Sequence, residues 1–556
     1  MSMPIETILF DMGGTLRTTN MRKREVDKGK VREMIALLGM ELDEEQLTAL
    51  LQERAKAYRN WAKKTLLELN EVDLWTRWML PDWPSDQVRQ HALQLNRLWR
   101  AATVKHEIFP ETKDVIVTLF RRGYRLGLVS NTTSSDEAPG ILKELEISGL
   151  FETVVLSCVV GIRKPDPAIL TLAAGRMGVS PQSCVYIGDQ PRRDVAAARK
   201  AGFSKAIIIN DQNKLESEAE QDSSLRPDYA ICNLNELLDI FPPRSAPQPA
   251  AVYDASLSTM WAMKNFPTLA DFFEAARRMG FAHIELNHKV TTPMLEGIDL
   301  HQHQFSSVHE PCPADISEDE LKKRDWLISS TDEARRMEAV KAIKRSIDIA
   351  SRLGASAIVI HAGHTTPDHD KLEKKLRDLI DAGQRDSDEY RVNFARMLKV
   401  RAEHVKDSFA AVQRSIQELL DYAEPLRIRL GLENRYHYLE HPNPDELEIL
   451  LKLAGSEQIG FLYDIGHAET LERLGFYSHS EWLERFASRM IGSHLHDVIA
   501  TVDHYAPGLG DLDFGMAAAS LPDNAFRTCE FQNFNSTEQV RAGLEFLVKH
   551  KCIKKL

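Results

Sequence analysis

Several features that would place a chain in a specialised class are missing from this sequence. Its six cysteines are scattered and form no Cys-x-x-Cys pair, which argues against a disulfide framework and fits a reducing compartment. No apolar run reaches the roughly 18 residues of a membrane span, and the start, MSMPIETILFDMGG, has no long apolar stretch. We therefore expect a cytoplasmic protein that is neither secreted nor inserted into a membrane.

An excess of positive charge is missing as well. Lys and Arg number 70 against 82 Asp and Glu, a net charge of −12, so the protein as a whole is not built to attract nucleic acid or anionic membrane. Small molecules are the expected partners, with a local basic groove and a homo-oligomer left open. At 556 residues the chain is too long for one core, so two or more domains are expected.

Four prolines mark the best domain boundary, in FPPRSAPQPAA at residues 241–251. Proline fits neither a helix interior nor a central strand, so we expect a semi-extended linker there. Over residues 1–240, strand-like and helical runs alternate, interrupted by a helical stretch at about 18–105. Over 252–556 the alternation resumes. The pattern predicts an α/β chain: a Rossmann-like domain with an inserted helical cap, then an eight-fold (β/α)8 TIM barrel.

Residues 366–424 form a long, polar, mixed-charge segment with helical periodicity. One interpretation is a solvated helical excursion on a barrel loop. The alternative is a lid over the active site or a contact with the other domain.

Acidic and imidazole side chains recur at the ends of short apolar runs in the second half. A parallel barrel gathers the C-terminal ends of its strands on one face, where such side chains converge as the ligands of a divalent cation do. The set comprises His309, His361, Glu433, Asp464, His467, His494, His504 and Glu530.

In the first domain, polar residues that could carry chemistry stand at strand ends or in loops at four places. Asp11 follows the first strand in FDMGGTL, where Gly13 and Gly14 allow a tight turn whose amides can face a phosphate. The later segments are RLGLVSN, GIRKPDP and VYIGDQPRRDV, which carry Ser130, Asn131, Lys164, Asp189 and Asp194.

Across about residues 5–237, these segments resemble the four motifs of the haloacid dehalogenase-like hydrolases. The resemblance implies that Asp11 attacks phosphorus and forms an aspartyl-phosphate. It implies that Ser130 and Lys164 hold the phosphoryl oxygens and that Asn131 contacts substrate. Mg²⁺ would be held by Asp11, Asp189 and Asp194.

One position departs from that pattern. The phosphatases of the family usually carry a second aspartate, the general acid, where this chain has Gly13. Losing such a group typically costs about 10² to 10⁴ in rate. Three alternatives follow: a phosphatase with a good leaving group or another acid, a different chemistry such as phosphonate cleavage or dehalogenation, or a domain that binds a phosphorylated ligand without turnover.

The segment STDEARRMEAVKAIKRSIDIASRLGASAIVIHAGH and the strand ends after it resemble the xylose isomerase-like barrels, over about residues 251–549. That superfamily includes sugar isomerases and epimerases, inosose dehydratases and endonuclease IV. The resemblance implies a Mn²⁺, Co²⁺, Zn²⁺ or Mg²⁺ ion bound by Glu433, Asp464, His494 and Glu530. His496, two residues from His494, could replace it as ligand. Glu433 and Glu530 would also exchange a proton on opposite faces of a sugar carbon.

Four histidines, His309, His361, His467 and His504, match the extra ligands of the three-metal endonuclease IV site. Many epimerase-like members keep them as substrate contacts. The endonuclease pattern has an aspartate two residues before the last histidine, where this chain has Val502 and places Asp503 next to His504. Adjacent residues on an extended segment point to opposite sides, which counts against a third metal.

Two further sequence features fall in the predicted barrel. P-G-L-G-D at 507–511 resembles a turn of the isomerases and epimerases. Glu285 either faces the site or acts as a capping or salt-bridge residue.

The leading hypothesis is a bifunctional, metal-dependent enzyme of carbohydrate metabolism. The barrel would isomerise or epimerise a sugar or sugar derivative, and the first domain would hydrolyse or bind a phosphorylated metabolite. The alternatives are endonuclease IV-like phosphodiester cleavage coupled to a phosphatase-like domain, which the acidic net charge disfavours, and a non-catalytic phospho-metabolite sensor.

Overall fold

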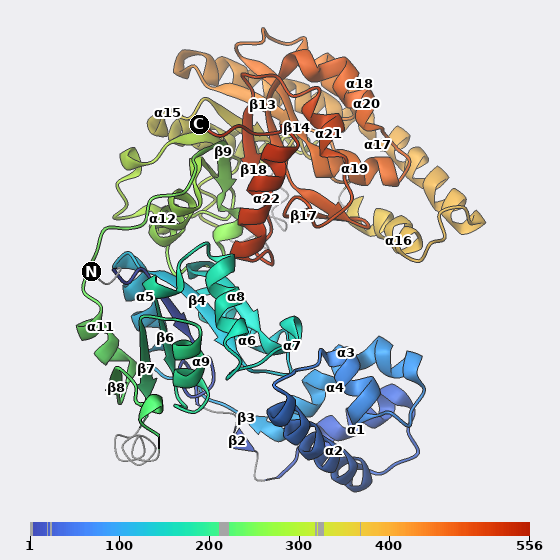
Figure 1. Ribbon diagram of the computed structural model, residues 1–556. Helices are drawn as coiled ribbons and strands as arrows, with labels where there is room; N and C mark the ends of the chain where they lie inside the picture. The colour runs from blue at the N-terminus through green and yellow to red at the C-terminus, as the bar shows by residue number, and fades with distance from the viewer. Residues whose placement is uncertain are drawn as a thin grey trace. The chain divides into compact units, whose positions relative to one another are not determined.

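The computed structural model describes residues 4–18, 21–22, 25–210, 222–316, 320, 327–366 and 369–556. The chain separates into two compact units, Met1–Pro247 and Gln248–Leu556 (Figure 1).

A six-stranded parallel sheet forms the centre of the first unit, in the order β5-β4-β1-β6-β7-β8. Its strands are almost entirely apolar because helices cover a sheet of this kind on both faces. They are β1 (Thr7–Phe10), β4 (Arg125–Ser130), β5 (Phe151–Leu156), β6 (Cys184–Gly188), β7 (Lys205–Ile209) and β8 (Tyr229–Ile231). The connecting helices include α5 (Thr112–Arg121), α6 (Glu137–Glu144), α7 (Ser157–Val160), α8 (Ala168–Arg176) and α9 (Asp194–Lys200).

The helical cap is inserted after β1 and has a hydrophobic core of its own, around the fully buried Trp75. An antiparallel pair, β2 (Met21–Arg22) and β3 (Val104–Lys105), encloses it at its two ends. Its helices are α1 (Lys28–Leu38), α2 (Glu44–Thr65), α3 (Glu71–Leu74), the π-helix η1 (Trp75–Met79) and α4 (Ser85–Thr103). Asp43 and Gln46 form a capping box that fixes the start of α2.

The first half of the proline-rich segment packs against the first unit. Phe241 is buried, and its carbonyl accepts a hydrogen bond from Arg122 Nη1 at 2.7 Å. Arg244 Nη1 donates to the carbonyl of Ile5 at 2.8 Å, and its guanidinium lies over the ring of Tyr124. The boundary between the units follows at Pro247.

The second unit is a closed barrel of eight parallel strands, in the order β9-β10-β11-β12-β13-β14-β15-β18. Their bounds are β9 Tyr253–Ser258, β10 Phe281–Leu286, β11 Phe305–His309, β12 Ala357–Ile360, β13 Arg429–Glu433, β14 Ile459–Asp464, β15 Met490–Leu495 and β18 Phe526–Cys529. The surrounding helices include α12 (Leu269–Met279), α15 (Glu333–Leu353), α18 (Pro444–Leu451), α19 (Ile465–Arg473), α20 (His479–Phe486), α21 (Phe514–Ala518) and α22 (Thr537–Lys549). All strand C-termini therefore open on one face.

The excursion after β12 folds into α16 (His369–Asp381) and α17 (Asp388–Ala423). Its inner side is packed on loops at the C-terminal face of the barrel: Arg377 donates to the carbonyls of Tyr436 and Thr501, at 2.8 and 2.9 Å. Glu373 is fully buried and accepts from the amide of Tyr438 at 2.7 Å. The segment therefore lies beside the strand ends, with its inner side packed on the barrel loops and its outer side exposed to solvent.

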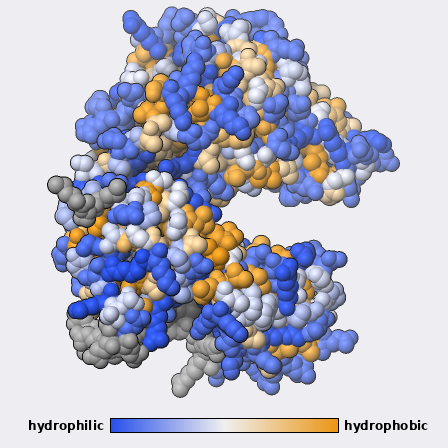
Figure 2. Space-filling model, viewed as in Figure 1, coloured by the Kyte–Doolittle hydropathy of each residue, from blue (hydrophilic) through white to orange (hydrophobic). Residues whose placement is uncertain are grey.

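Within the described residues, no helix combines the length and apolar character needed to cross a bilayer. The face drawn in Figure 2 is mostly hydrophilic, with apolar side chains in patches.

Candidate metal centre and aspartate site

Glu433, Asp464, His494 and Glu530 meet at the C-terminal face of the barrel, with one donor atom from each lying within 4.8 Å of the others. They end or follow β13, β14, β15 and β18, so the barrel itself brings them together. His494 Nδ1 lies 2.8 Å from Glu433 Oε1, 3.0 Å from Glu530 Oε2 and 3.5 Å from Asp464 Oδ2. All four residues are almost completely buried.

Several atoms of this group have no hydrogen-bond partner among the described residues. They are Glu433 Oε1, Glu530 Oε1, His494 Nδ1 and Oε1 of the neighbouring Glu285. An unpartnered buried polar atom costs about 1–3 kcal/mol, and more when it is charged. Four buried carboxylates in one place require counter-charge beyond what His494 and the buried Arg435 supply, and oxygen and imidazole donors of this kind fit a divalent metal ion.

Glu285 lies against this group rather than at a distant cap. Its Oε2 is 3.2 Å from His494 Nε2, on the opposite edge of the ring from the other carboxylates. Burial opposes a charge on His494, but Glu530 and Glu285 raise its pKa well above the usual histidine value.

Two further groups of donors flank the central one: His309 and His361 with Glu433, and His467, His496 and His504 with Asp464. The Nδ1–H of His309 donates to the carbonyl of Glu310, and that of His467 to the carbonyl of Asn434, each at 3.0 Å. These bonds fix the tautomer and leave each Nε2 with a lone pair facing the site, as in metal-ligating histidines.

His496 has the opposite tautomer. Its Nδ1 accepts the backbone N–H of His504 at 2.9 Å, so its Nε2 carries the proton and donates to Asp464 Oδ1 at 2.9 Å. This ring therefore has no lone pair to offer and instead orients Asp464. The geometry favours His494 over His496 as the ligand.

The expectation that Asp503 and His504 point to opposite sides is wrong. Both belong to β17 (Val502–Tyr505), which pairs with β16 (Asp497–Ile499), but His504 has a φ of +62°. This left-handed conformation breaks the alternation of an extended strand. Asp503 Oδ2 consequently lies 3.4 Å from His467 Nε2, and Asp503 Oδ1 lies 2.8 Å from His504 Nδ1.

Two residues at the barrel face were not predicted from the sequence. Arg435 is buried and places Nη1 2.6 Å from Glu433 Oε2, with Nη2 3.2 Å from Glu440. Asp497 accepts the backbone N–H groups of Gly508, Gly510 and two other residues, and so holds the 507–511 turn. The sequence signal for these two residues is that they directly follow the Glu433 and His494 motifs.

In the first unit, the aspartates expected at the ends of β1 and β6 also meet. Donor atoms of Asp11, Asp189 and Asp194 lie within 4.8 Å of one another. The buried Lys164 Nζ lies 2.9 Å from Asp11 Oδ1 and 3.0 Å from Asp194 Oδ1. Asn131 exchanges two 2.9 Å hydrogen bonds with the backbone of Lys164 and thereby fixes its loop. Ser130 ends β4 and is buried beside them.

A further cation, Arg193, lies among these carboxylates and was not foreseen. Its Nη2 is 2.6 Å from Asp11 Oδ2, 2.5 Å from Asp189 Oδ1 and 3.1 Å from Asp194 Oδ2. Burial raises the pKa of Asp189 to about 6, against the opposing effect of Arg193. The oxygen donors suit Mg²⁺ by type, but they are already paired.

The two glycines after Asp11 differ in their constraints. Gly14 has a φ of +80°, and a Cβ there would lie 2.3 Å from Asp189 Oδ2. Gly13 is open: among the described residues, a Cβ would meet only Arg17 Nη1, at 4.0 Å. Position 13 therefore has room for a side chain, and no acid takes its place there.

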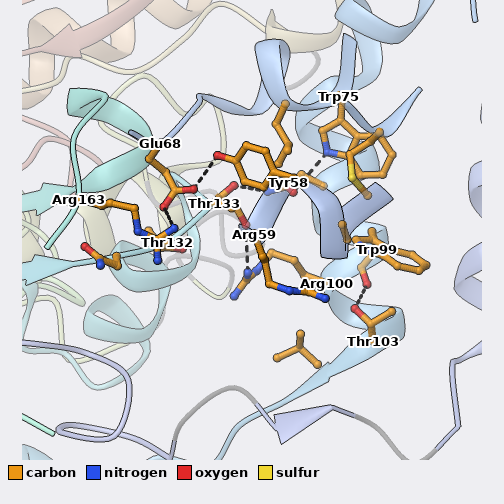
Figure 3. A pocket seen from close by; sticks show the side chains of 16 residues that line it. Tyr58, Arg59, Glu68, Trp75, Trp99, Arg100, Thr103, Thr132, Thr133 and Arg163 are labelled. Atoms are coloured by element: carbon orange, nitrogen blue, oxygen red, sulfur yellow. Dashed lines mark hydrogen bonds and ion pairs between the residues drawn. The ribbon is translucent and has the colours of Figure 1, made fainter. Parts of the chain in front are cut away.

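A cavity of about 310 Å³ lies between the cap and the strand ends of the sheet (Figure 3). Tyr58, Trp75 and Trp99 line it from the cap, and Asn131 from the core. Its other charged and polar lining includes Arg59, Arg100, Arg163, Glu68, Thr132 and Thr133. Glu68 is held by Tyr58 at 2.6 Å and Arg163 at 3.0 Å.

The two units match different families of known proteins. The family model for haloacid dehalogenase-like hydrolases matches residues 5–202, and that for the xylose isomerase-like TIM barrel matches residues 273–550. A glyceraldehyde 3-phosphate phosphatase of Methanopyrus kandleri is 30% identical over 237 residues, which cover 42% of this chain and 97% of that protein. A phosphoglycolate phosphatase of Escherichia coli (strain K12) is 34% identical over 131 residues, 24% of this chain and half of that protein.

Solved structures match each unit at lower identity. A D-tagatose 3-epimerase-like protein is 18% identical with a TM-score of 0.39, over 53% of this chain and 96% of that one. A 2-haloacid dehalogenase from Pseudomonas syringae pv. Tomato DC3000 is 24% identical with a TM-score of 0.31, over 42% of this chain and 97% of that one.

Proposed function

Because the chain belongs to the haloacid dehalogenase-like hydrolases through its first unit and to the xylose isomerase-like TIM barrels through its second, we propose a bifunctional enzyme of carbohydrate metabolism. The barrel is a divalent-metal-dependent isomerase or epimerase of a sugar or sugar derivative. The first unit is a phosphohydrolase that uses Asp11 as nucleophile. The observation that supports the barrel activity best is the buried convergence of Glu433, Asp464, His494 and Glu530 with unpartnered donor atoms.

The barrel carboxylates suit proton transfer at carbon. Burial opposes the ionisation of Glu433 and Glu530, but His361 and His494 beside Glu433, and His494 beside Glu530, hold both pKa values well below the usual range. Both groups are therefore ionised, which makes them weak bases. It is their position on either side of a substrate carbon that would let one remove a proton and the other, once protonated, return it. A divalent ion held by Glu433, Asp464, His494 and Glu530 would polarise the carbonyl next to that carbon. His309 and His361 line the same face as substrate contacts or further ligands.

In the first unit, the proposed reaction begins at Asp11. Its carboxylate attacks phosphorus, the bond to the leaving oxygen breaks, and water then hydrolyses the aspartyl-phosphate. Lys164 and Ser130 neutralise and hold the phosphoryl oxygens. Since no acid stands at Gly13, the leaving oxygen must take its proton from water or be a weak base. The cavity lined by Tyr58, Trp75 and Trp99 receives the organic part of the phosphate ester.

Solvent exchange tests the barrel activity. An isomerase or epimerase that moves protons incorporates deuterium from D₂O into a ketose or inosose, which NMR detects at the exchanging carbon. We expect exchange in the metal-loaded protein and its loss in Glu530→Gln. Glu457→Gln, an exposed glutamate of the same unit, is the matched control. Equal exchange in wild type and Glu530→Gln would contradict the proposal.

Phosphate release tests the first unit. Wild type is expected to hydrolyse p-nitrophenyl phosphate and Asp11→Asn to lose that activity. Equal rates would rule out the aspartyl mechanism, and ligand-dependent stabilisation without any turnover would indicate a binding domain.

A second candidate for the barrel is phosphodiester cleavage. The observation that favours it is Asp503, whose carboxylate contacts His467 and His504, two members of the donor group that includes Asp464. Cleavage of an abasic-site duplex, together with three metal ions per chain, would favour this function. One or two ions and no cleavage would leave the isomerase or epimerase.

A further inference from the structure

The two candidate cation sites of this protein differ in how their donors are satisfied. Among the described residues, Glu433 Oε1, His494 Nδ1 and Glu530 Oε1 at the barrel face make no aligned hydrogen bond, although His494 Nδ1 lies 2.8 Å from Glu433 Oε1. At the aspartate site, a single nitrogen atom, Arg193 Nη2, lies within 3.1 Å of all three carboxylates. The guanidinium therefore occupies the point on which the aspartates converge.

Charge supports this interpretation. Asp11, Asp189 and Asp194 bring three carboxylates into a nearly solvent-free site, with side-chain exposures of 4%, 9% and 0%. Such a cluster requires counter-charge, because like charges at this distance in a low-dielectric site repel strongly. Of the three carboxylates, Lys164 Nζ contacts those of Asp11 and Asp194. The counter-charge in contact with Asp189 is therefore that of Arg193.

The Arg193 side chain can also leave the site, because it is partly exposed to solvent. Its side chain is 22% exposed, unlike the buried Lys164 at 0%. It lies at the N-terminal end of α9, next to Asp194, so rotation of its side chain toward solvent would free the carboxylates without moving the sheet. Lys164, held by the carbonyl of Val129 and by Tyr186, has no such freedom.

We propose that Arg193 is the resident cation of the aspartate site and that a divalent ion binds only by displacing it. The inference rests on the proposed cation site at Asp11, Asp189 and Asp194. It makes metal occupancy of the first unit a competition within the chain.

The test is Mn²⁺ binding to the full chain, followed by electron paramagnetic resonance. Binding to the aspartate site is identified as the component that disappears in Asp11→Asn/Asp189→Asn. In Arg193→Gln, which keeps a hydrogen-bonding side chain but no charge, this component is expected to tighten by about tenfold or more, since one counter-charge at contact distance is removed. Arg192→Gln removes a charge from the same loop and is expected to bind as wild type does.

Thermal unfolding gives a second measure that does not depend on activity. In chelator, Arg193→Gln should melt below Arg192→Gln, and Mg²⁺ should restore it by a larger shift than in wild type. Unchanged or weaker Mn²⁺ binding in Arg193→Gln would overturn the proposal and make Arg193 a residue that positions the carboxylates. If neither wild type nor Arg193→Gln has a component that the double aspartate variant removes, the cation site itself fails, and this inference fails with it.

Discussion

Gly466, at the start of α19, leaves the space that His496 fills. A Cβ on this residue would lie 2.1 Å from His496 Cε1 and 2.4 Å from its Nδ1, closer than real contacts allow. His496 is fully buried, so the whole ring must shift. We therefore expect Gly466→Ala to break both hydrogen bonds of that ring, to Asp464 and from the amide of His504.

The magnitude follows from these two bonds. Each contributes about 1–2 kcal/mol, the one to the carboxylate being the stronger. The better helix propensity of alanine returns about 1 kcal/mol. The free energy of unfolding is therefore expected to fall by about 1–3 kcal/mol. Because Asp464 loses the partner that orients it, metal affinity at the barrel face should fall by about 10- to 100-fold.

Urea unfolding and Mn²⁺ titration of the full chain measure the two effects. Gly455→Ala is the matched control, since among the described residues nothing lies within 4 Å of a Cβ there. Its metal affinity should equal that of wild type. If Gly466→Ala bound Mn²⁺ at the barrel face as tightly as wild type, the role assigned to His496 would be refuted.

Three further predictions concern other parts of the chain. Gly13→Asp supplies the missing acid in an open position beside Arg17, so hydrolysis of an alkyl phosphate should rise by about 10²-fold while p-nitrophenyl phosphate, with its good leaving group, changes little; parallel changes for both esters would contradict this. Burial lowers the pKa of His437, but the Glu373 carboxylate 3.0 Å away outweighs it and raises the pKa. Below the unfolded histidine pKa of about 6.5 the pair stabilises the fold fully, and this contribution is lost as pH rises through the raised pKa. The difference in unfolding free energy between wild type and His437→Gln should therefore shrink as pH rises above about 6.5 in urea unfolding, and a constant difference would refute it. Asp497→Asn places an amide N–H group against backbone donors and should cost about 2–4 kcal/mol in the same measurement; a loss below about 0.5 kcal/mol would show that the 507–511 turn is held by other contacts.

The convergence of the strand-end side chains could be predicted because a parallel barrel obeys one geometric rule. Every strand presents its C-terminus to the same face, so an acid or imidazole at the end of each apolar run is enough to place Glu433, Asp464 and Glu530 near one another. The parallel-sheet domain and the eight-stranded barrel followed from the alternation of strand-like and helical runs. None of these inferences needed the conformation of an individual residue.

What the sequence could not give depends on single dihedral angles and on the reach of long side chains. The +62° φ of His504 reverses the direction expected for Asp503, and no residue type there requires that angle. The tautomer of His496 depends on an amide eight residues away. Arg193, in the GDQPRRD loop, was not predicted as part of the site, because nothing in the sequence tells which way a flexible guanidinium turns.

Glu433 and Asp464 each belong to two of the three donor groups at the barrel face. A shared carboxylate makes neighbouring affinities interdependent, because charge neutralised at one position is no longer available to the next. Metal uptake should therefore depart from a simple hyperbola, with early ions changing the affinity for later ones. Preparations of the same folded chain would then differ in activity according to how many ions each carries. The metal content of a sample is part of its chemistry and should be fixed before rates are compared.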